Sequence, residues 1–539
     1  MPKRYISHSQ QTPASQDLPL VERDIRTTFI ASVDRVLRNT PDPKVKQSPG
    51  VYVGIAAAEG TILMNMHLRA LPRELKLGHT HEDLLSFNDA YLASALKLFP
   101  TALTKPTSPS RCSFLETPIG LATLILEHAH DESLPWRAAL DLIRGAVHDV
   151  LVESSIADDD GCEVLYGRAG LLYALIRLRL LFENASSTPV SRAVHDAQVT
   201  PDSTLERIMD SILAHGRYGA KTYAAEVSSA AAPPLMWSWC GKRYLGGAHG
   251  VAGILHMLLQ CPPHLLSPDA CADVWATIAW LLRLQDKDGN WRTKAPTVDA
   301  AFDKNELIQW CHGAPGILML LCRALRHPSA SRYTHILPEL THAIDKATSL
   351  IYRHGLLRKG LGACHGVAGS VFALLTCARL YLHPPPAWTK GKTPAYASHT
   401  RVDSGDLSDG SASPTPRTSP TTPPTATFAA AAHTPFPTPL ATLADHPALL
   451  SSPLPTPIIG ELDDLEAKGR KALYRAVHLA HLVLSPEVFA KMFVPDRPHS
   501  LYEGLAGMCC AWAAVLAALR GCGAEEGCWG MPGYDDLML

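Results

Sequence analysis

Two short stretches of this sequence place a cysteine, a histidine and two glycines in the same order. The first is Cys311-His312-Gly313-Ala314-Pro315-Gly316, and the second is Cys364-His365-Gly366-Val367-Ala368-Gly369. Thiolate and imidazole are ligands that zinc prefers in proteins. Both cysteines with one or both histidines therefore predict a zinc site, and three protein ligands with one open position are typical of a catalytic zinc.

Each stretch taken alone has a simpler interpretation. Free cysteine is among the most buried residue types, so each could be a core cysteine that happens to precede a histidine. The repetition of Cys-His-Gly-x-x-Gly at equivalent places in a longer repeat favours the metal site.

Seven openings of the Gly-x-x-Gly kind recur along the chain, mostly about 50 to 80 residues apart, and each leads into an apolar run of helix length. A period of this size indicates one supersecondary unit per repeat. The openings begin at Tyr52, Ser113, Leu165, Gly247, Trp310, Ala363 and Leu501. Amphipathic segments of helix length lie before and between them, for example 21–37, 138–152, 272–284, 336–351 and 473–484.

Each unit is therefore predicted to be a helical hairpin with one apolar helix and one half-polar helix. A helix that is apolar all round must be buried. About seven inner and seven outer helices close most simply into a double ring, so the predicted fold is an all-α α/α toroid. The glycines would place the N-termini of the inner helices at one end of the ring, where unpaired N–H groups favour thiolates and anions.

Composition restricts the class of protein. The chain has 539 residues, of which 46% are hydrophobic and 19% charged, and its formal net charge is −2. We expect no nucleic-acid partner, because no basic face is evident. No apolar run approaches the length of a membrane span, and no signal peptide is evident at the start. The 13 cysteines show no disulfide framework. We expect a cytoplasmic monomer, and peripheral attachment to a membrane is compatible with the sequence.

One segment departs from the helical pattern. Residues 383–459 are rich in Pro, Ser, Thr and Ala and lack an apolar period. Such composition cannot bury enough apolar surface to offset the entropy lost on ordering. We interpret it as a disordered insertion within a single toroid domain that spans residues 1–539.

Five strings of residues carry a resemblance to a known family. They are Leu165-Tyr166-Gly167-Arg168-Ala169-Gly170, Gly247-Ala248-His249-Gly250-Val251-Ala252-Gly253, Trp310-Cys311-His312-Gly313-Ala314-Pro315-Gly316, Cys364-His365-Gly366 and Leu501-Tyr502-Glu503-Gly504-Leu505-Ala506-Gly507. In these strings the sequence resembles the LanC-like (lanthionine synthetase C-like) proteins. The chain is most similar to the eukaryotic, glutathione-binding branch, whose zinc motif has the form Trp-Cys-His-Gly-Ala-Pro-Gly.

The resemblance implies that Cys311, Cys364 and His365 are the zinc ligands, with water or a substrate thiol in the fourth position. It also implies an acid–base role for His249. Glu163 falls where bacterial cyclases have an acidic residue, and His312 replaces a tyrosine of those enzymes.

The same resemblance implies a glutathione site. Lys359 matches a lysine that contacts glutathione in animal relatives, and Arg4 matches an N-terminal arginine with the same role. A second glutathione-contacting arginine appears here as Phe493, and the nearby Arg497 is a candidate substitute. The first two units also depart from the family pattern, with Ala57 for a glycine and Glu116-Thr117 for Cys-Gly.

The expected reaction is zinc-dependent thiol addition. The resemblance implies addition of glutathione to dehydroalanine or dehydrobutyrine residues in proteins, and elimination of phosphate from phosphoserine or phosphothreonine. His249 and His312 can move protons near pH 7. Two alternatives stay open. One is a signalling adapter that binds zinc and glutathione without turnover, which Phe493 favours. The other is a carbohydrate-active toroid, which needs two opposed carboxylates about 5–10 Å apart.

Overall fold

The structure is a computed structural model. It describes residues 3–38, 49–54, 58–73, 78–129, 133–153, 156, 159–183, 188–227, 231–297, 306–385, 388, 462–524 and 527–537. The described helices belong to one compact unit built from Met1–Trp388 and Ile458–Leu539. The predicted insertion at 383–459 lies almost wholly outside the described residues, as does Ala57, so the insertion stays a prediction.

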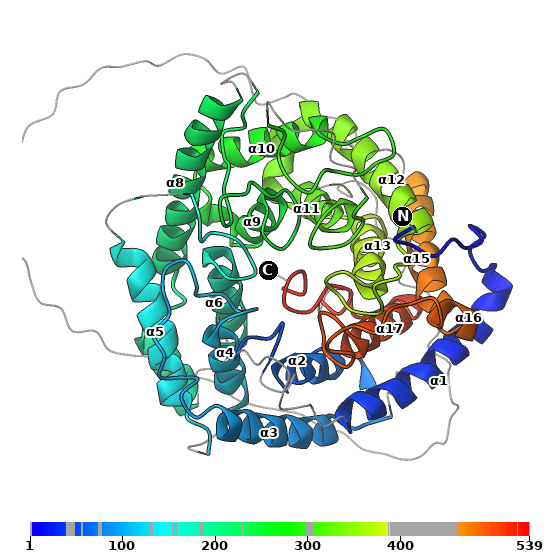
Figure 1. The fold of residues 1–539 in the computed structure, drawn as a ribbon, viewed down its shortest axis with the longest axis horizontal. Coiled ribbons are helices and arrows are strands. Elements are labelled where there is room, and N and C mark those ends of the chain that lie inside the picture. Colours follow the sequence, from blue (N-terminus) through cyan, green and yellow to red (C-terminus); the bar gives the residue numbers. More distant parts are fainter. Residues whose placement is uncertain are drawn as a thin grey trace, which may run out of the picture. The chain divides into compact units, whose positions relative to one another are not determined.

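Within this unit two concentric sets of helices follow one another around a ring (Figure 1). The inner set is α2 (Ala58–Arg69), α4 (Pro118–His128), α6 (Arg168–Phe182), α9 (Val251–Leu258), α11 (Ala314–Arg326), α13 (Val367–Leu382) and α17 (Leu505–Leu519). The outer set is α1 (Leu18–Leu37), α3 (His81–Leu98), α5 (Trp136–Val152), α8 (Asp202–Glu226), α10 (Pro268–Arg283), α12 (Leu337–His354) and α15 (Leu462–Leu482). Short helices α7 (Pro189–Asp196) and α16 (Pro486–Phe489) lie in the connections. Only isolated β-bridges occur in the described part of the chain, so the predicted all-α toroid is confirmed.

The inner ring is closed. Each inner helix contacts the next in the order α2, α4, α6, α9, α11, α13 and α17, and α17 contacts α2. Inner helices are buried on every side: in α13 every residue from Val367 to Tyr381 is buried. Outer helices bury one stripe, as in α12, where Leu340, Ile344, Ala347 and Ile351 repeat with the helical period. The difference in burial follows from the two kinds of hydrophobic pattern in the sequence.

The loops that enter the inner helices are hydrogen-bonded to one another in sequence. The backbone bonds run from Tyr52 N to Leu115 O, Ser113 N to Tyr166 O, Val164 N to Ala248 O, Gly247 N to Trp310 O, Cys311 N to Cys364 O and Cys364 N to Tyr502 O. Because each loop lies at the start of its helix, these bonds place the inner-helix N-termini at one end of the ring. That prediction is confirmed.

The second glycine of six openings is required by a close backbone contact. A Cβ atom built on it would lie 2.0–2.3 Å from the carbonyl oxygen of the residue six positions earlier, closer than real Cβ atoms come to a carbonyl. The glycines are Gly120, Gly170, Gly253, Gly316, Gly369 and Gly507. The repeated glycine therefore lets each loop fold onto the first turn of its own inner helix.

The C-terminal segment 527–537 enters the middle of the ring (Figure 1). Its Asp535 is buried and accepts a hydrogen bond from Thr376 Oγ1 at 2.6 Å, with His256 Nε2 at 3.3 Å and an Arg379 nitrogen at 3.6 Å. The ring of Tyr534 packs edge-on against Trp310, with ring centroids 5.0 Å apart. Segment 527–537 thus packs inside the ring against Trp310, the residue that precedes Cys311.

A search of the described helices for a segment long and apolar enough to cross a lipid bilayer finds none.

Candidate metal centre

The two Cys-His stretches come together at the start of α11 and α13. Side-chain ligand atoms of Cys311, Cys364 and His365 all lie within 4.8 Å of one another. Both cysteines are buried and the histidine is half-buried. Among the described residues this is the one group of three or more Cys, His, Asp or Glu side chains with metal-ligand spacing. Two sulfurs and one imidazole nitrogen form a donor set that fits zinc.

The two thiols differ in their protonation. The Cys364 thiol donates a hydrogen bond to the Cys311 sulfur, and together with His365 and the nearby His312 it holds the pKa of Cys311 well below the usual range. Burial, and next the neighbouring Cys311 sulfur, raise the pKa of the Cys364 thiol well above its usual range. A metal ion that binds both sulfurs would displace the proton held between them, so the donors fit a divalent metal.

Backbone hydrogen bonds fix both cysteines. Cys311 N donates to Cys364 O at 3.4 Å, and Cys364 N donates to Tyr502 O at 2.8 Å. Gly313, which precedes α11, has a φ of 100°, and a Cβ there would lie 2.0 Å from Leu307 O. A glycine is needed at this position because L side chains rarely adopt that conformation. The chain therefore turns sharply just after His312.

The triad lies on the wall of a pocket of about 360 Å³. Residues that line it and carry chemistry are Arg4, Tyr52, His249, Gln309, Cys311, His312, Lys359, Cys364 and His365. Lys359 and Arg4 are exposed, and Arg4 also pairs with Glu306 at 3.6 Å. No carboxylate is present among the described lining residues, so the pocket lacks the pair that carbohydrate hydrolysis requires.

His249 and Glu163 form a hydrogen-bonded pair beside the triad. Glu163 Oε2 lies 3.0 Å from His249 Nδ1, and the carboxylate also accepts bonds from the backbone N–H groups of Leu165 and Tyr166 at 2.6 and 2.7 Å. Glu163 is fully buried. Burial raises its pKa, and the hydrogen bonds from His249 and the two amides oppose that rise. Because Nδ1 faces Glu163, Nε2 is the His249 nitrogen left for a substrate in the pocket.

The His249 ring is clamped by aromatic neighbours. Trp239 stacks on it with ring centroids 5.3 Å apart and planes 3° apart, and Tyr244 lies between it and His312 at 5.8 and 5.4 Å. Burial lowers the pKa of His312, so its ring is neutral at pH 7 and can accept a proton. Two imidazoles with fixed orientations thus face the pocket that contains the triad.

Two residues expected at the glutathione site do not line the pocket. Arg497 forms an ion pair with Glu503 at 3.2 Å. Phe493 is 63% exposed, and its backbone N–H donates to Arg358 O. The arginine is therefore engaged with a neighbouring carboxylate, and the phenylalanine side chain lies in solvent.

Three further residues at this site were not predicted. Gln309 Nε2 lies 3.1 Å from Cys311 Sγ, the Tyr52 hydroxyl donates to Cys364 Sγ, and Trp239 covers His249. Gln309 stands two residues before Cys311 and Tyr52 opens the first repeat, so the motif positions could have indicated both. Trp239 lies outside the motifs, and no signal in the sequence marks it.

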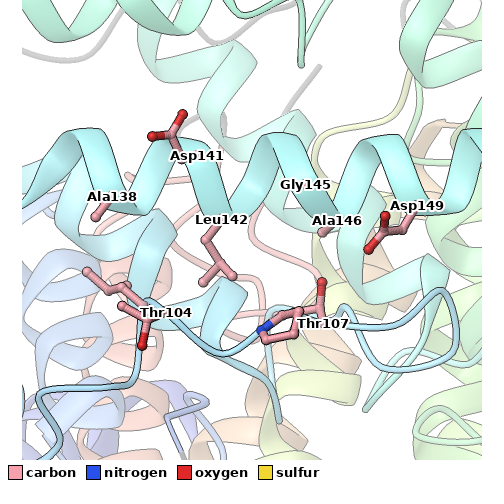
Figure 2. Close-up of a pocket in the computed structure, with 10 residues that line it drawn as sticks. Thr104, Thr107, Ala138, Asp141, Leu142, Gly145, Ala146 and Asp149 are labelled. Atoms are coloured by element: carbon pink, nitrogen blue, oxygen red, sulfur yellow. The ribbon is translucent and has the colours of Figure 1, made fainter.

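A second pocket of about 360 Å³ lies beside the outer helix α5 (Figure 2). Leu142 points from the helix toward the loop that contains Thr104 and Thr107, whereas Asp141 points away from that loop. Its two carboxylates, on Asp141 and Asp149, do not converge, and its lining residues include neither cysteine nor histidine. This second pocket therefore lacks the cysteine and histidine side chains of the pocket at the helix N-termini.

Known proteins are similar to this chain in sequence. The sequence model of one family, described as lanthionine synthetase C-like protein, matches residues 76–390. "Glutathione S-transferase LANCL1" from Danio rerio is 30% identical over 223 residues, which cover 41% of this chain and 48% of the relative. "LanC-like protein GCL1" from Arabidopsis thaliana is 30% identical over 219 residues, which cover 40% of this chain and 42% of the relative. The chain thus spans less than half the length of these curated relatives. A solved structure of nisin cyclase matches at 17% identity with a TM-score of 0.40, over 67% of this chain and 83% of that one.

Proposed function

Because the chain belongs to the lanthionine synthetase C-like family, we propose that it is a zinc-dependent enzyme that adds glutathione to dehydroalanine or dehydrobutyrine residues in proteins. Eliminating phosphate from phosphoserine or phosphothreonine to form those residues is the second half of the proposal. The observation that carries it is the triad of two sulfurs and one imidazole within 4.8 Å, in a pocket that two further histidines line.

Cys311, Cys364 and His365 would hold the metal. A bound zinc ion supplies a Lewis acid that lowers the pKa of a coordinated thiol and so yields a thiolate at neutral pH. Lys359 and Arg4 supply positive charge at the same pocket, which suits the carboxylates of glutathione. Glutathione is also the substrate that the name of the Danio rerio relative indicates.

The histidines handle the protons. In the addition, the thiol loses its proton, its sulfur forms a bond to the β-carbon of the alkene, and the α-carbon gains a proton. His249 Nε2 can accept the thiol proton and then deliver it to the α-carbon while Glu163 holds Nδ1. In the elimination, a base removes the α-proton and phosphate leaves from the β-carbon. His312 is a suitable base because it is neutral at pH 7.

The test is incubation of the protein with glutathione and either a phosphoserine or a dehydroalanine peptide, followed by mass spectrometry. Cys364→Ala should abolish addition to the preformed dehydroalanine peptide. His249→Ala should retain its zinc, measured by elemental analysis, and slow the reaction by roughly 100- to 10,000-fold. Full activity of the His249 variant on both peptides would contradict the assigned proton transfer.

The adapter alternative makes a different prediction, and the exposed Phe493 favours it because the side chain offers no charge to glutathione. If the wild-type protein binds glutathione but forms no adduct with either peptide, the adapter replaces the enzyme.

A further inference from the structure

Each cysteine sulfur of the triad receives a hydrogen bond from a side chain that is not a metal-ligand candidate. Gln309 Nε2 donates to Cys311 Sγ at 3.1 Å, and the Tyr52 hydroxyl donates to Cys364 Sγ. The two donors come from distant parts of the chain and both line the pocket. Each sulfur thus has its own donor.

The backbone holds Gln309 in place. Gln309 and His312 form an isolated bridge in which the Gln309 N–H donates to His312 O at 3.0 Å and the His312 N–H donates to Gln309 O at 3.1 Å. Trp310 and Cys311 form the corner between them. Backbone hydrogen bonds already hold both ends of this corner. The Gln309 amide therefore donates to the Cys311 sulfur without the entropy cost of ordering further residues.

Tyr52 is held by a different set of contacts. Its ring stacks on Tyr502 with centroids 4.9 Å apart and planes 26° apart, and its backbone N–H donates to Leu115 O at 2.8 Å. Tyr502 is itself fully buried, and its hydroxyl donates to Pro532 O at 2.9 Å. The Tyr52 hydroxyl is therefore presented to Cys364 by a fixed aromatic stack.

The proposed function would place excess negative charge at the site, and these two hydrogen bonds would offset it. Two cysteine thiolates and one substrate thiolate on a divalent ion would give the site one net negative charge in a largely buried position. Hydrogen bonds to a charged acceptor are stronger than neutral ones, and they withdraw electron density from the sulfur. Donors on the two resident sulfurs would thus favour binding of the third thiolate.

We propose that Gln309 and Tyr52 are positioning residues that donate one hydrogen bond to each resident thiolate and thereby let the site accept the thiolate of glutathione. This inference rests on the proposed metal site. It assigns the two side chains a role in substrate binding through the cysteines, without contact with the reacting carbon atoms.

The full chain loaded with Co²⁺ tests the inference, because cobalt reports its thiolate ligands by a charge-transfer absorption band that needs no turnover. Tyr52→Phe removes only the hydroxyl and keeps the stacked ring, and Gln309→Met removes the amide but keeps the length of the side chain. We expect each variant to bind cobalt, to shift the band to longer wavelength, and to bind glutathione about 10-fold more weakly in a titration followed at that band. Tyr91→Phe is the control, because it also removes a phenol hydroxyl, but one on the outer helix α3 that donates to Leu37 O at 2.8 Å instead of to a sulfur; its spectrum should match the wild type.

The outcomes separate the two proposals. A wild-type protein that binds cobalt without a thiolate band refutes the metal site itself. A wild-type band that keeps its position and glutathione response in both Tyr52→Phe and Gln309→Met refutes the role of the two donors and leaves the metal site standing. If one variant fails to fold, the other alone decides the role of the donors.

Discussion

Gly369→Ala should damage the proposed metal centre although residue 369 is not one of its proposed ligands. A Cβ at this position would lie 2.3 Å from the carbonyl oxygen of Ala363, the residue directly before Cys364. Real Cβ atoms essentially never come closer than 3.0 Å, so the carbonyl must retreat from 2.3 Å to at least that distance, by about 0.7 Å. Because the obstructing atom is backbone, Cys364 must move with it.

The expected loss follows from that displacement. A misplacement of about 1 Å in a catalytic group can cost about 100-fold in rate, and overpacking a core costs about 1–3 kcal/mol of stability. We therefore expect Gly369→Ala to weaken zinc binding and to lower addition to a dehydroalanine peptide by somewhat less than 100-fold. The assays are a competition titration with a chromophoric zinc chelator and the mass-spectrometric adduct assay.

The control is Gly145→Ala in the middle of α5, where a Cβ would meet nothing within 4 Å. That change should leave zinc binding unaltered and stabilise the helix by up to about 1 kcal/mol. If Gly369→Ala binds zinc as tightly as Gly145→Ala, the close packing of this glycine does not position Cys364, and the reasoning is wrong.

Three further predictions concern binding, the insertion and pH. Lys359→Ala should raise the glutathione concentration at half-maximal rate more than Arg497→Ala does, because only the lysine lines the pocket; equal effects would contradict this assignment. Deletion of residues 389–457 should leave zinc content and melting temperature nearly unchanged, and a variant that fails to fold would show that the segment packs on the ring. Burial raises the pKa of Asp535, but Arg379 and other partners outweigh it and lower the pKa from 3.8 to about 2. Folding thus favours the carboxylate form of Asp535. This preference contributes about 2 kcal/mol to the free energy of unfolding above about pH 4, and the contribution is lost as the pH falls through about 2. Asp535→Asn should remove this pH dependence from unfolding curves measured between pH 5 and 2.

The sequence alone determined the repeat and the types of donor group at the candidate site. Helical periodicity and glycine spacing are local properties, so they predicted seven inner helices, their common N-terminal end and the outer helices 21–37, 138–152, 272–284, 336–351 and 473–484. The pairing of each cysteine with a following histidine predicted the thiol and imidazole groups that lie together in the structure. These predictions held because a helix start and a buried apolar face leave a direct trace in neighbouring residues.

The tertiary structure alone decided which side chains meet. Closure of the ring brings Glu163 under His249, 86 residues away, and stacks Tyr52 of the first repeat on Tyr502 of the last. An isolated bridge between Tyr5 and Leu357 brings the N-terminal segment, and with it Arg4, to the pocket. Arg497 is near in sequence to the expected glutathione residue, yet its pairing with Glu503 directs it elsewhere. Such contacts depend on how the loops pack across the ring, and no short-range pattern in the sequence encodes that packing.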